Sequence, residues 1–220
     1  VRPHSSLEPV ATLLPHLTVH RHDGSTEAME RILQAAKPGV VFHLASLFLT
    51  QHQPADITRL VESNLLFATQ LAEAMARHGV RHLVNTGTFW QHFGQNASEP
   101  VNLYAATKQA FEAILSHYVA SDGLRVITLK LSDTYGPGDP RKKLPHLLLD
   151  LARSGTPLAM SPGEQEIDMV HIDDVVRAFQ LAAERLLTGK VAGHEQYAVS
   201  SGAPLPLRKL VELFAQTVGR

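Results

Sequence analysis

The sequence contains no cysteine among its 220 residues. That absence excludes disulfide bonds, thiolate nucleophiles and cysteine-ligated zinc, and it fits a cytoplasmic protein. No apolar run reaches the length of a membrane span, and we expect no signal peptide at the N-terminus. The 13 histidines are numerous, but none follows the H-E-x-x-H spacing, so we also expect no metal site.

An excess of charge is also missing, because 20 Lys and Arg residues stand against 21 Asp and Glu residues. A chain with a formal net charge of −1 gives no support for binding to nucleic acid or to a membrane surface. Hydrophobic residues make up 44% of the chain, which is ample for the core of one domain or one and a half.

Apolar periodicity alternates between strand and helix along the chain. We expect strands at 17–20, 40–45, 81–85, 125–131 and 196–199, and helices at 26–36, 56–78, 104–120, 144–153, 173–187 and 207–218. This rhythm predicts an α/β fold with a parallel, doubly wound sheet and right-handed crossovers. The continuous apolar run at 40–45 is typical of a strand buried on both faces.

Residues 136–140 are rich in Gly and Pro, and the sequence pattern changes on passing them. We expect residues 1–135 to form a first domain and residues 136–220 to form a small lobe interleaved with the last core strands. Such a lobe closes over a substrate in the cleft at the carboxyl ends of the strands.

The segment Tyr104-Ala-Ala-Thr-Lys108 carries the chemistry. A Tyr and a Lys four residues apart share one face of a helix. The ammonium is expected to lower the pKa of Tyr104 toward neutrality, so that the phenol can exchange a proton with a hydroxyl or carbonyl oxygen. Thr88, at the end of an apolar strand, could bind the same oxygen. This trio predicts the proton-handling half of a hydride-transfer site, although a half-buried Tyr beside a solvated Lys is the simpler alternative.

These motifs together resemble the extended short-chain dehydrogenase/reductase family, in its NAD-dependent epimerase/dehydratase branch that acts on nucleotide sugars. The resemblance covers nearly the whole chain. It also rests on the segments His43-Leu44-Ala45-Ser46, Thr134–Asp139, Asp168–Asp174 and Tyr197–Gly202. It implies a Rossmann-like sheet, a dinucleotide-binding domain at 1–135, a substrate-binding lobe at 136–220 and a homodimer formed through the helices at 56–78 and 104–120.

The resemblance implies roles residue by residue. The catalytic residues would be Thr88, Tyr104 and Lys108. The cofactor-binding residues would be Arg2, Asp23, Gly24, Leu44, Ala45, Ser46, Asn64, Thr86, Tyr104, Lys108 and Leu131. The residues facing a nucleotide sugar would be Thr88, Phe89, Trp90, Asp133, Arg141 and Lys143. Two alternatives stay open. Trp90 could simply pack in the core, and Arg141 and Lys143 could belong to a solvated basic turn. Asp133 stands where relatives often carry Asn, and a carboxylate facing a diphosphate is unfavourable.

The family opens with a strand and a glycine-rich turn that seats the cofactor diphosphate. No G-x-x-G-x-x-G occurs here, and Val1 is expected at the end of the second strand. We therefore expect the first strand, the glycine loop and the first helix to be missing, with trimming favoured over degeneration. Arg2, close to Ser5 and Ser6, favours NADP over NAD because an Arg accommodates the 2′-phosphate.

Residues around the trio narrow the reaction. Phe89 and Trp90 stand where a 4,6-dehydratase of the family would carry an Asp-Glu pair, which disfavours dehydration. The segments around Thr88, Tyr104 and Asp133 resemble the branch of CDP-abequose synthase-type ketoreductases, which implies reduction of a nucleotide-linked 4-keto-deoxysugar. A 4-epimerase that retains bound NAD is the alternative, and a non-catalytic cofactor-binding relative is the second.

Overall fold

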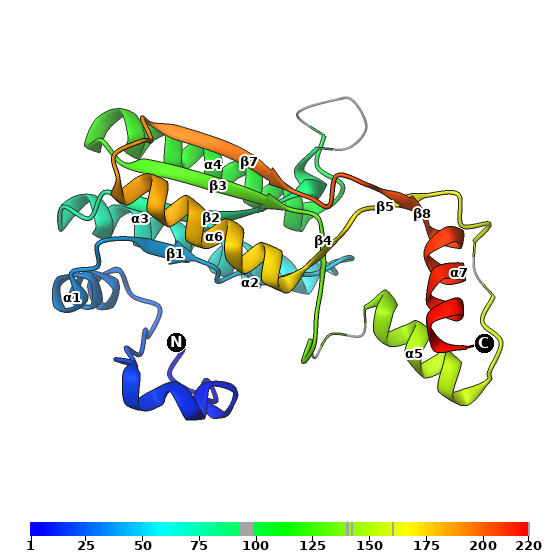
Figure 1. Cartoon of the computed structure of the whole chain (residues 1–220). Helices are drawn as coiled ribbons and strands as arrows, with labels where there is room; N and C mark the ends of the chain where they lie inside the picture. The colour runs from blue at the N-terminus through cyan, green and yellow to red at the C-terminus, as the bar shows by residue number, and fades with distance from the viewer. Residues whose placement is uncertain (93–98, 140, 142, 160, 220) are drawn as a thin grey trace.

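The computed structural model describes residues 1–92, 99–139, 141, 143–159 and 161–219. Its centre is a four-stranded sheet in the order β1-β2-β3-β7, in which every neighbouring pair is parallel (Figure 1). The strands are β1 (Val41–His43), β2 (His82–Thr88), β3 (Arg125–Leu131) and β7 (His194–Val199). Parallel neighbours require crossover helices, as the alternating sequence pattern predicts.

Helices cover both faces of this sheet, α6 on one side and α3 and α4 on the other (Figure 1). These helices are α1 (Thr26–Ala36), which packs on α3, then α3 (Phe67–Arg77), α4 (Leu103–Asp122) and α6 (Ile172–Leu187). Because successive side chains of a strand alternate, Leu83 and Val126 pack under α3 and α4, whereas Val84 and Ile127 pack under α6. The doubly wound, Rossmann-like fold predicted from the sequence is confirmed.

The helix expected at 56–78 is built from three segments in succession. A 3-10 turn (Pro54–Asp56) leads into α2 (Ile57–Val61), a π-helical turn follows (Glu62–Leu66), and α3 completes it. The π-turn contains Asn64, whose side chain is buried. Such single-turn bulges are frequent at functional sites.

Smaller elements lie beside the sheet. β4 (Asp133–Tyr135) pairs in parallel with β6 (Met169–His171), and β5 (Glu166–Ile167) pairs antiparallel with β8 (Leu205–Pro206). Helices α5 (Leu144–Ser154) and α7 (Leu207–Val218) contact each other to one side of the sheet (Figure 1). The segment after residue 136 thus contributes all these outer elements except β4, and it also contributes strand β7 of the central sheet and the helix α6 that covers it.

Two local expectations are wrong. Residues 17–20 form no strand, and the chain instead forms a 3-10 helix just before them, at Glu8–His16. Near these residues, the terminal amine of Val1 donates a hydrogen bond to the His20 carbonyl, and the His22 amide donates one to the Val1 carbonyl. These two hydrogen bonds stand in place of the pairing that a strand would make. The expected 40–45 strand shrinks to β1, an edge of the described sheet, and this leaves Phe42 43% and Leu44 61% exposed.

Candidate active site

The carboxyl end of β2 runs directly into a 3-10 turn at Phe89–Gln91. Thr88 caps this turn, because its hydroxyl oxygen accepts a hydrogen bond from the Trp90 amide at 3.3 Å. The Gln91 side chain returns to accept from the Thr88 amide at 2.8 Å, which completes a capping box. The Thr88 hydroxyl is therefore held in place as an acceptor and still has its proton to donate.

Tyr104 lies in the first turn of α4, after Asn102, whose side chain caps the helix by accepting from the Ala105 amide at 2.9 Å. Its ring contacts Phe48 edge-on at 5.0 Å between centroids, and Phe48 also contacts Trp90 at 5.6 Å. Phe48 thereby joins Tyr104 to the turn that Thr88 caps.

Burial raises the pKa of Tyr104, and the opposing effects of the Ser46 hydroxyl and the Arg141 guanidinium are smaller. The expectation that Lys108 would bring this pKa down toward neutrality is wrong here, because desolvation of the phenolate dominates. Tyr104 therefore holds its proton at neutral pH, as a proton donor must.

Lys108 follows Tyr104 by one helical turn and is only 3% exposed. Burial lowers the pKa of Lys108 to about 8, while the Glu112 carboxylate one turn further on opposes that shift. The alternative of a solvated lysine is thereby excluded. Tyr104 itself is partly buried, and Lys108 lies one helical turn beyond it on α4.

Buried polar side chains continue behind the Thr88 turn, and the sequence analysis missed them. Gln91 donates to the Glu112 carboxylate at 2.7 Å, and Glu112 forms an ion pair with Lys130 on β3 at 3.4 Å. Lys130 in turn contacts the His92 ring. The Thr88-x-x-Gln91 spacing of a capping box and the position of Glu112 one turn beyond Lys108 are signals that could have found them.

A loop between β1 and α2 carries Ser46, which was expected at the cofactor. Asn64 fixes this loop, because its amide oxygen accepts from the Leu47 amide at 2.7 Å and its NH₂ donates to the Leu47 carbonyl at 3.0 Å. The same NH₂ group donates to Thr107 on α4 at 3.0 Å. Asn64 thus ties the Ser46 loop to the helix of Tyr104.

The residues that the resemblance assigns to the adenosine end of the cofactor are Arg2, Asp23 and Gly24. They lie far from Tyr104 along the chain and are exposed. Asp23 accepts two hydrogen bonds from Ser25, at 2.9 Å from its amide and 2.6 Å from its hydroxyl, and these lower the pKa of Asp23. Gly24 adopts a φ of 101°, which favours glycine. Arg2 is exposed and donates to the Ser63 hydroxyl at 3.2 Å.

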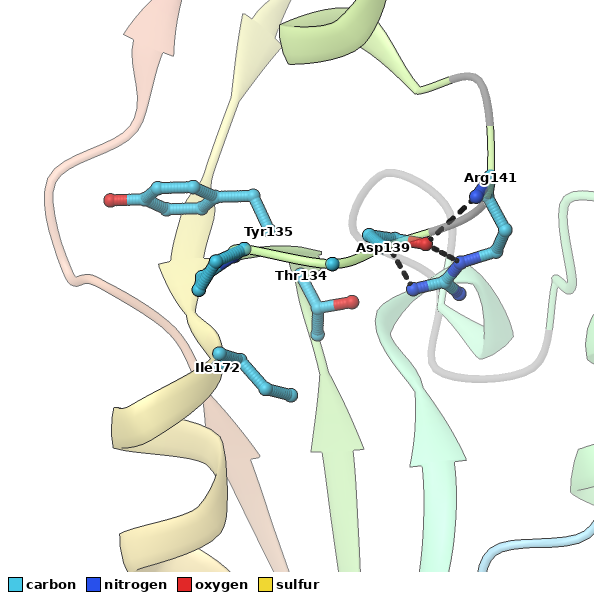
Figure 2. Close-up of a pocket in the computed structure, with 8 residues that line it drawn as sticks. Thr134, Tyr135, Asp139, Arg141 and Ile172 are labelled. Carbon is cyan, nitrogen blue, oxygen red and sulfur yellow. Dashed lines mark hydrogen bonds and ion pairs between the residues drawn. The ribbon is translucent and has the colours of Figure 1, made fainter. Parts of the chain in front are cut away.

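The predicted substrate-side turn lines a cavity of about 350 Å³, shown in Figure 2. The cavity is bounded by Thr134, Tyr135, Gly136, Pro137, Gly138, Asp139, Arg141 and Ile172. Arg141 reaches back to Asp139 with two side-chain bonds of 2.7 Å, so its guanidinium is held within the turn (Figure 2). This pairing lowers the pKa of Asp139 to about 2.

The remaining predicted substrate residues flank this cavity or the Thr88 turn. Lys143 donates to the carbonyl and the hydroxyl of Thr134 at 2.8 and 3.1 Å. Burial raises the pKa of Asp133, with Asp168 adding to that shift and Lys143 opposing it. Phe89 is 42% exposed, whereas Trp90 is partly buried against Phe48.

Several features fit the nicotinamide end of a dinucleotide. The Thr86 and Ser132 hydroxyls, near the carboxyl ends of β2 and β3, are buried without a hydrogen-bond partner in the described part of the chain. Leu44 and Ala45, beyond β1, are exposed, and Leu131 ends β3 beside Thr88. The glycine loop that seats a diphosphate in the resembled family is not among these residues.

Two kinds of feature are absent from the residues that the structure describes. No helix there is both long and apolar enough to cross a membrane. No group of three or more His, Asp or Glu side chains there is arranged to hold a metal ion.

Comparison with known proteins gives a consistent family. The model of the NAD dependent epimerase/dehydratase family matches residues 5–197. CDP-abequose synthase of Salmonella typhimurium is 24% identical over 192 residues, which are 86% of this chain and 62% of that protein. The 2-alkyl-3-oxoalkanoate reductase of Stenotrophomonas maltophilia is 30% identical over 174 residues, 72% of this chain and 51% of that protein. The chain thus spans between half and two thirds of these relatives.

Solved structures agree on the architecture. The UDP-glucose 4-epimerase of Thermus thermophilus, determined in complex with NAD, superposes with a TM-score of 0.79 at 26% identity. That superposition covers 99% of this chain and 73% of the epimerase chain.

Proposed function

The chain belongs to the NAD dependent epimerase/dehydratase family, and we propose that it reduces a nucleotide-linked 4-keto-deoxysugar with Tyr104 as the proton donor. The observation that carries this proposal is the pair on α4, in which a partly buried, protonated Tyr104 lies one helical turn from a buried Lys108. The similarity to CDP-abequose synthase supports reduction of a sugar carbonyl.

The residues divide the work between holding an oxygen and supplying a proton. The Thr88 hydroxyl donates a hydrogen bond to the sugar carbonyl oxygen. Tyr104 transfers its proton to that oxygen as the carbonyl carbon is reduced, and the Lys108 ammonium stabilises the tyrosinate left behind. The chemistry that a bound reduced nicotinamide cofactor supplies is the hydride for the carbonyl carbon.

Residues at two places would hold that cofactor. Ser46, Thr86 and Lys108 would bind its nicotinamide end, along Leu44, Ala45 and Leu131. Asp23, Gly24 and Arg2 would bind its adenosine end, and Arg2 supports NADP because a guanidinium pairs with a 2′-phosphate. Asn64 would act indirectly, through the Ser46 loop that it fixes.

The nucleotide sugar would lie between the Thr88 turn and the 134–141 turn. Phe89 and Trp90 would line the sugar, beside Asp133. Arg141 and Lys143 would contact the diphosphate, since guanidinium and ammonium groups are the usual phosphate partners in proteins. Such a role for Arg141 requires that it exchange the Asp139 carboxylate for the ligand. A homodimer through α2, α3 and α4 stays a prediction.

A 4-epimerase with retained NAD is the second candidate, and the similarity to the Thermus thermophilus UDP-glucose 4-epimerase favours it. Both reactions use the same proton donor, but only a reductase consumes reduced cofactor. The 2-alkyl-3-oxoalkanoate reductase similarity adds a third outcome, reduction of a ketone that carries no nucleotide.

The test follows the absorbance of reduced nicotinamide with the natural full-length protein and a nucleotide-linked 4-keto-6-deoxysugar, with NADPH and NADH side by side. We expect stoichiometric loss of NADPH. Conversion of the sugar to an isomer without net consumption would instead establish the epimerase. If neither cofactor supports conversion, the same assay with a ketone that carries no nucleotide separates the third outcome, loss of reduced cofactor, from a non-catalytic relative.

Replacement of Tyr104 tests the mechanism. Tyr104→Phe removes the proton donor and should lower turnover by roughly 10²- to 10⁴-fold while leaving cofactor binding largely intact. Tyr118→Phe is the matched control, because Tyr118 lies on the same helix and donates to Glu73 at 3.0 Å, away from the site. Wild-type turnover in Tyr104→Phe would exclude Tyr104 as the donor.

A further inference from the structure

We propose that Glu112 is a positioning residue that acts through Gln91 to fix the Thr88 end of the site to the helix that carries Tyr104 and Lys108. The inference rests on the proposed function for its meaning in catalysis, but the contacts that carry it stand independently. Neither Glu112 nor Gln91 is expected to touch the substrate.

Thr88 and Tyr104 come from different segments, the end of β2 and the start of α4. Among the described residues between them, the Val101 amide donates to the Trp90 carbonyl at 2.9 Å. Side-chain contacts add to this restraint on the relative position of Thr88 and Tyr104, which matters because misplacement of reacting groups by about 1 Å can cost about 100-fold in rate.

The restraint is a continuous path of short hydrogen bonds. The Thr88 amide donates to the Gln91 side chain at 2.8 Å, and the Gln91 amide group donates to Glu112 at 2.7 Å. Gln91 is fully buried, and Glu112 is 8% exposed. Water cannot readily replace either bond, so breaking one leaves a buried polar group unsatisfied.

Glu112 is well placed for this task because of its spacing on α4. Tyr104, Lys108 and Glu112 follow one another at intervals of four residues, which puts them on one side of the helix over about 12 Å of its length. A single rigid helix thus presents the proton donor, the ammonium and the anchor of the Thr88 turn. Any displacement of α4 moves both ends of the site together.

The charge of Glu112 is shared among buried cations. Its carboxylate lies 3.4 Å from the Lys130 ammonium and also favours the protonated form of Lys108. Lys130 additionally contacts His92, the residue after the turn. One carboxylate therefore neutralises part of the positive charge under the site and orients the Gln91 amide.

The first experiment uses Trp90, the only tryptophan in the chain, as a reporter on the turn. Gln91→Leu keeps the volume but removes both hydrogen bonds, and we expect a red-shifted emission and stronger acrylamide quenching of Trp90. Glu112→Gln should give a smaller change of the same sign. Ser116→Ala, one turn further along α4 at a hydroxyl that bonds only the Glu112 backbone carbonyl, is the matched control.

The exchanged double variant Gln91→Glu with Glu112→Gln supplies the rescue. It restores a carboxylate–amide pair with donor and acceptor reversed, so we expect the Trp90 emission to return toward that of the wild type. Should Gln91→Leu fail to fold, Gln91→Asn takes its place, because it keeps the amide but shortens its reach. Unchanged Trp90 quenching in a folded Gln91 variant would overturn the proposal.

Kinetics separate positioning from stability. In the nicotinamide assay we expect Gln91→Leu to lower kcat by about 10- to 100-fold with KM for the sugar nucleotide changed less than about 3-fold. A rise in KM by the same factor as the fall in kcat, or an unchanged kcat, would contradict a positioning role. If the wild-type protein consumes no cofactor, the proposed function fails, and the Trp90 measurement still decides whether Glu112 fixes the turn.

Discussion

Two turns border the candidate site, and they are held in opposite ways. The turn after β2 is held by buried groups, with Gln91 fully buried and Glu112 8% exposed. The turn after β4 is held by an ion pair at the surface, in which the Arg141 side chain is 54% exposed and that of Asp139 12%. Buried polar bonds are costly to break, whereas exposed ion pairs contribute about 0–1 kcal/mol.

The difference separates two tasks within one site. In the proposed reaction, the inner turn would position Thr88, where the geometry of proton transfer must be fixed before the substrate arrives. The outer turn would let the Arg141 guanidinium exchange Asp139 for an anionic ligand. On this proposal the rigid turn serves proton transfer and the more adaptable turn serves binding.

The largest expected effect on stability comes from lowering the pH, which protonates the buried His43 beside β2. Burial lowers the pKa of His43 to about 4 from its usual 6.5, and its ring lies 3.0 Å from the Asn85 side chain on β2. Between pH 6.5 and 4 the unfolded chain binds a proton that the folded one does not. The free energy of unfolding should therefore fall by about 3 kcal/mol as the pH is lowered through this window.

Urea unfolding at several pH values measures this loss. His43→Gln keeps an amide that can bond Asn85 but cannot titrate, so its stability should change less over the same window. His52→Gln, at an exposed position, should keep the wild-type pH dependence. Parallel profiles for His43→Gln and the wild type would show that His43 does not carry the effect.

A smaller effect is expected from overpacking the inner turn. A Cβ added at Gly87 would lie 2.8 Å from Gln91 Oε1, 2.9 Å from Thr128 Cγ2 and 3.0 Å from Lys130 Cγ. Because these groups are buried, Gly87→Ala should destabilise the fold by about 1–3 kcal/mol. Thermal unfolding checks this against Gly39→Ala, whose added methyl meets its nearest neighbour at 3.8 Å. Equal stability of the two variants would mean that the inner turn is not tightly packed.

The smallest expected effect on stability concerns the outer turn, the one that follows β4. Asp139→Asn weakens the two-bond pairing with Arg141, whose side chain is half exposed, and we expect the free energy of unfolding to fall by only about 1 kcal/mol, measured in urea near neutral pH. The released guanidinium should lower KM for the nucleotide sugar while kcat stays near its wild-type value. A large loss of stability would show that the outer turn is as rigid as the inner one.

The sequence alone predicts the architecture well where the pattern is local. The strand at 125–131 and the helix at 26–36 have the predicted bounds, because apolar alternation and the Ser25 cap are local signals. The expected strand at 17–20 fails for the opposite reason, since a strand needs a partner that the local pattern does not specify. The apolar residues Phe42 and Leu44 likewise suggest burial, but Phe42 lies exposed in the edge strand and Leu44 lies exposed just beyond it.

The site follows the same rule. Tyr104 and Lys108 are recognisable from helical spacing, and what the structure adds is the burial of Lys108 beside a partly buried Tyr104. Gln91 and Lys130 are distant from Glu112 along the chain, so only the fold brings the three together. The direction of the Tyr104 pKa shift could not be predicted, because spacing reports the neighbouring charge but not the loss of solvent.

The π-turn at Glu62–Leu66 has a consequence for how the chain tolerates change in length. An extra residue in a regular helix rotates everything beyond it by about 100°, unless one turn widens to absorb it, as a π-turn does. Deleting one residue there should restore a regular helix with the apolar side of α3 still on the sheet, but it would remove the wide turn that holds the Asn64 amide at the Ser46 loop. The widened turn thus presents Asn64 to the loop without changing the side that α3 packs on the sheet.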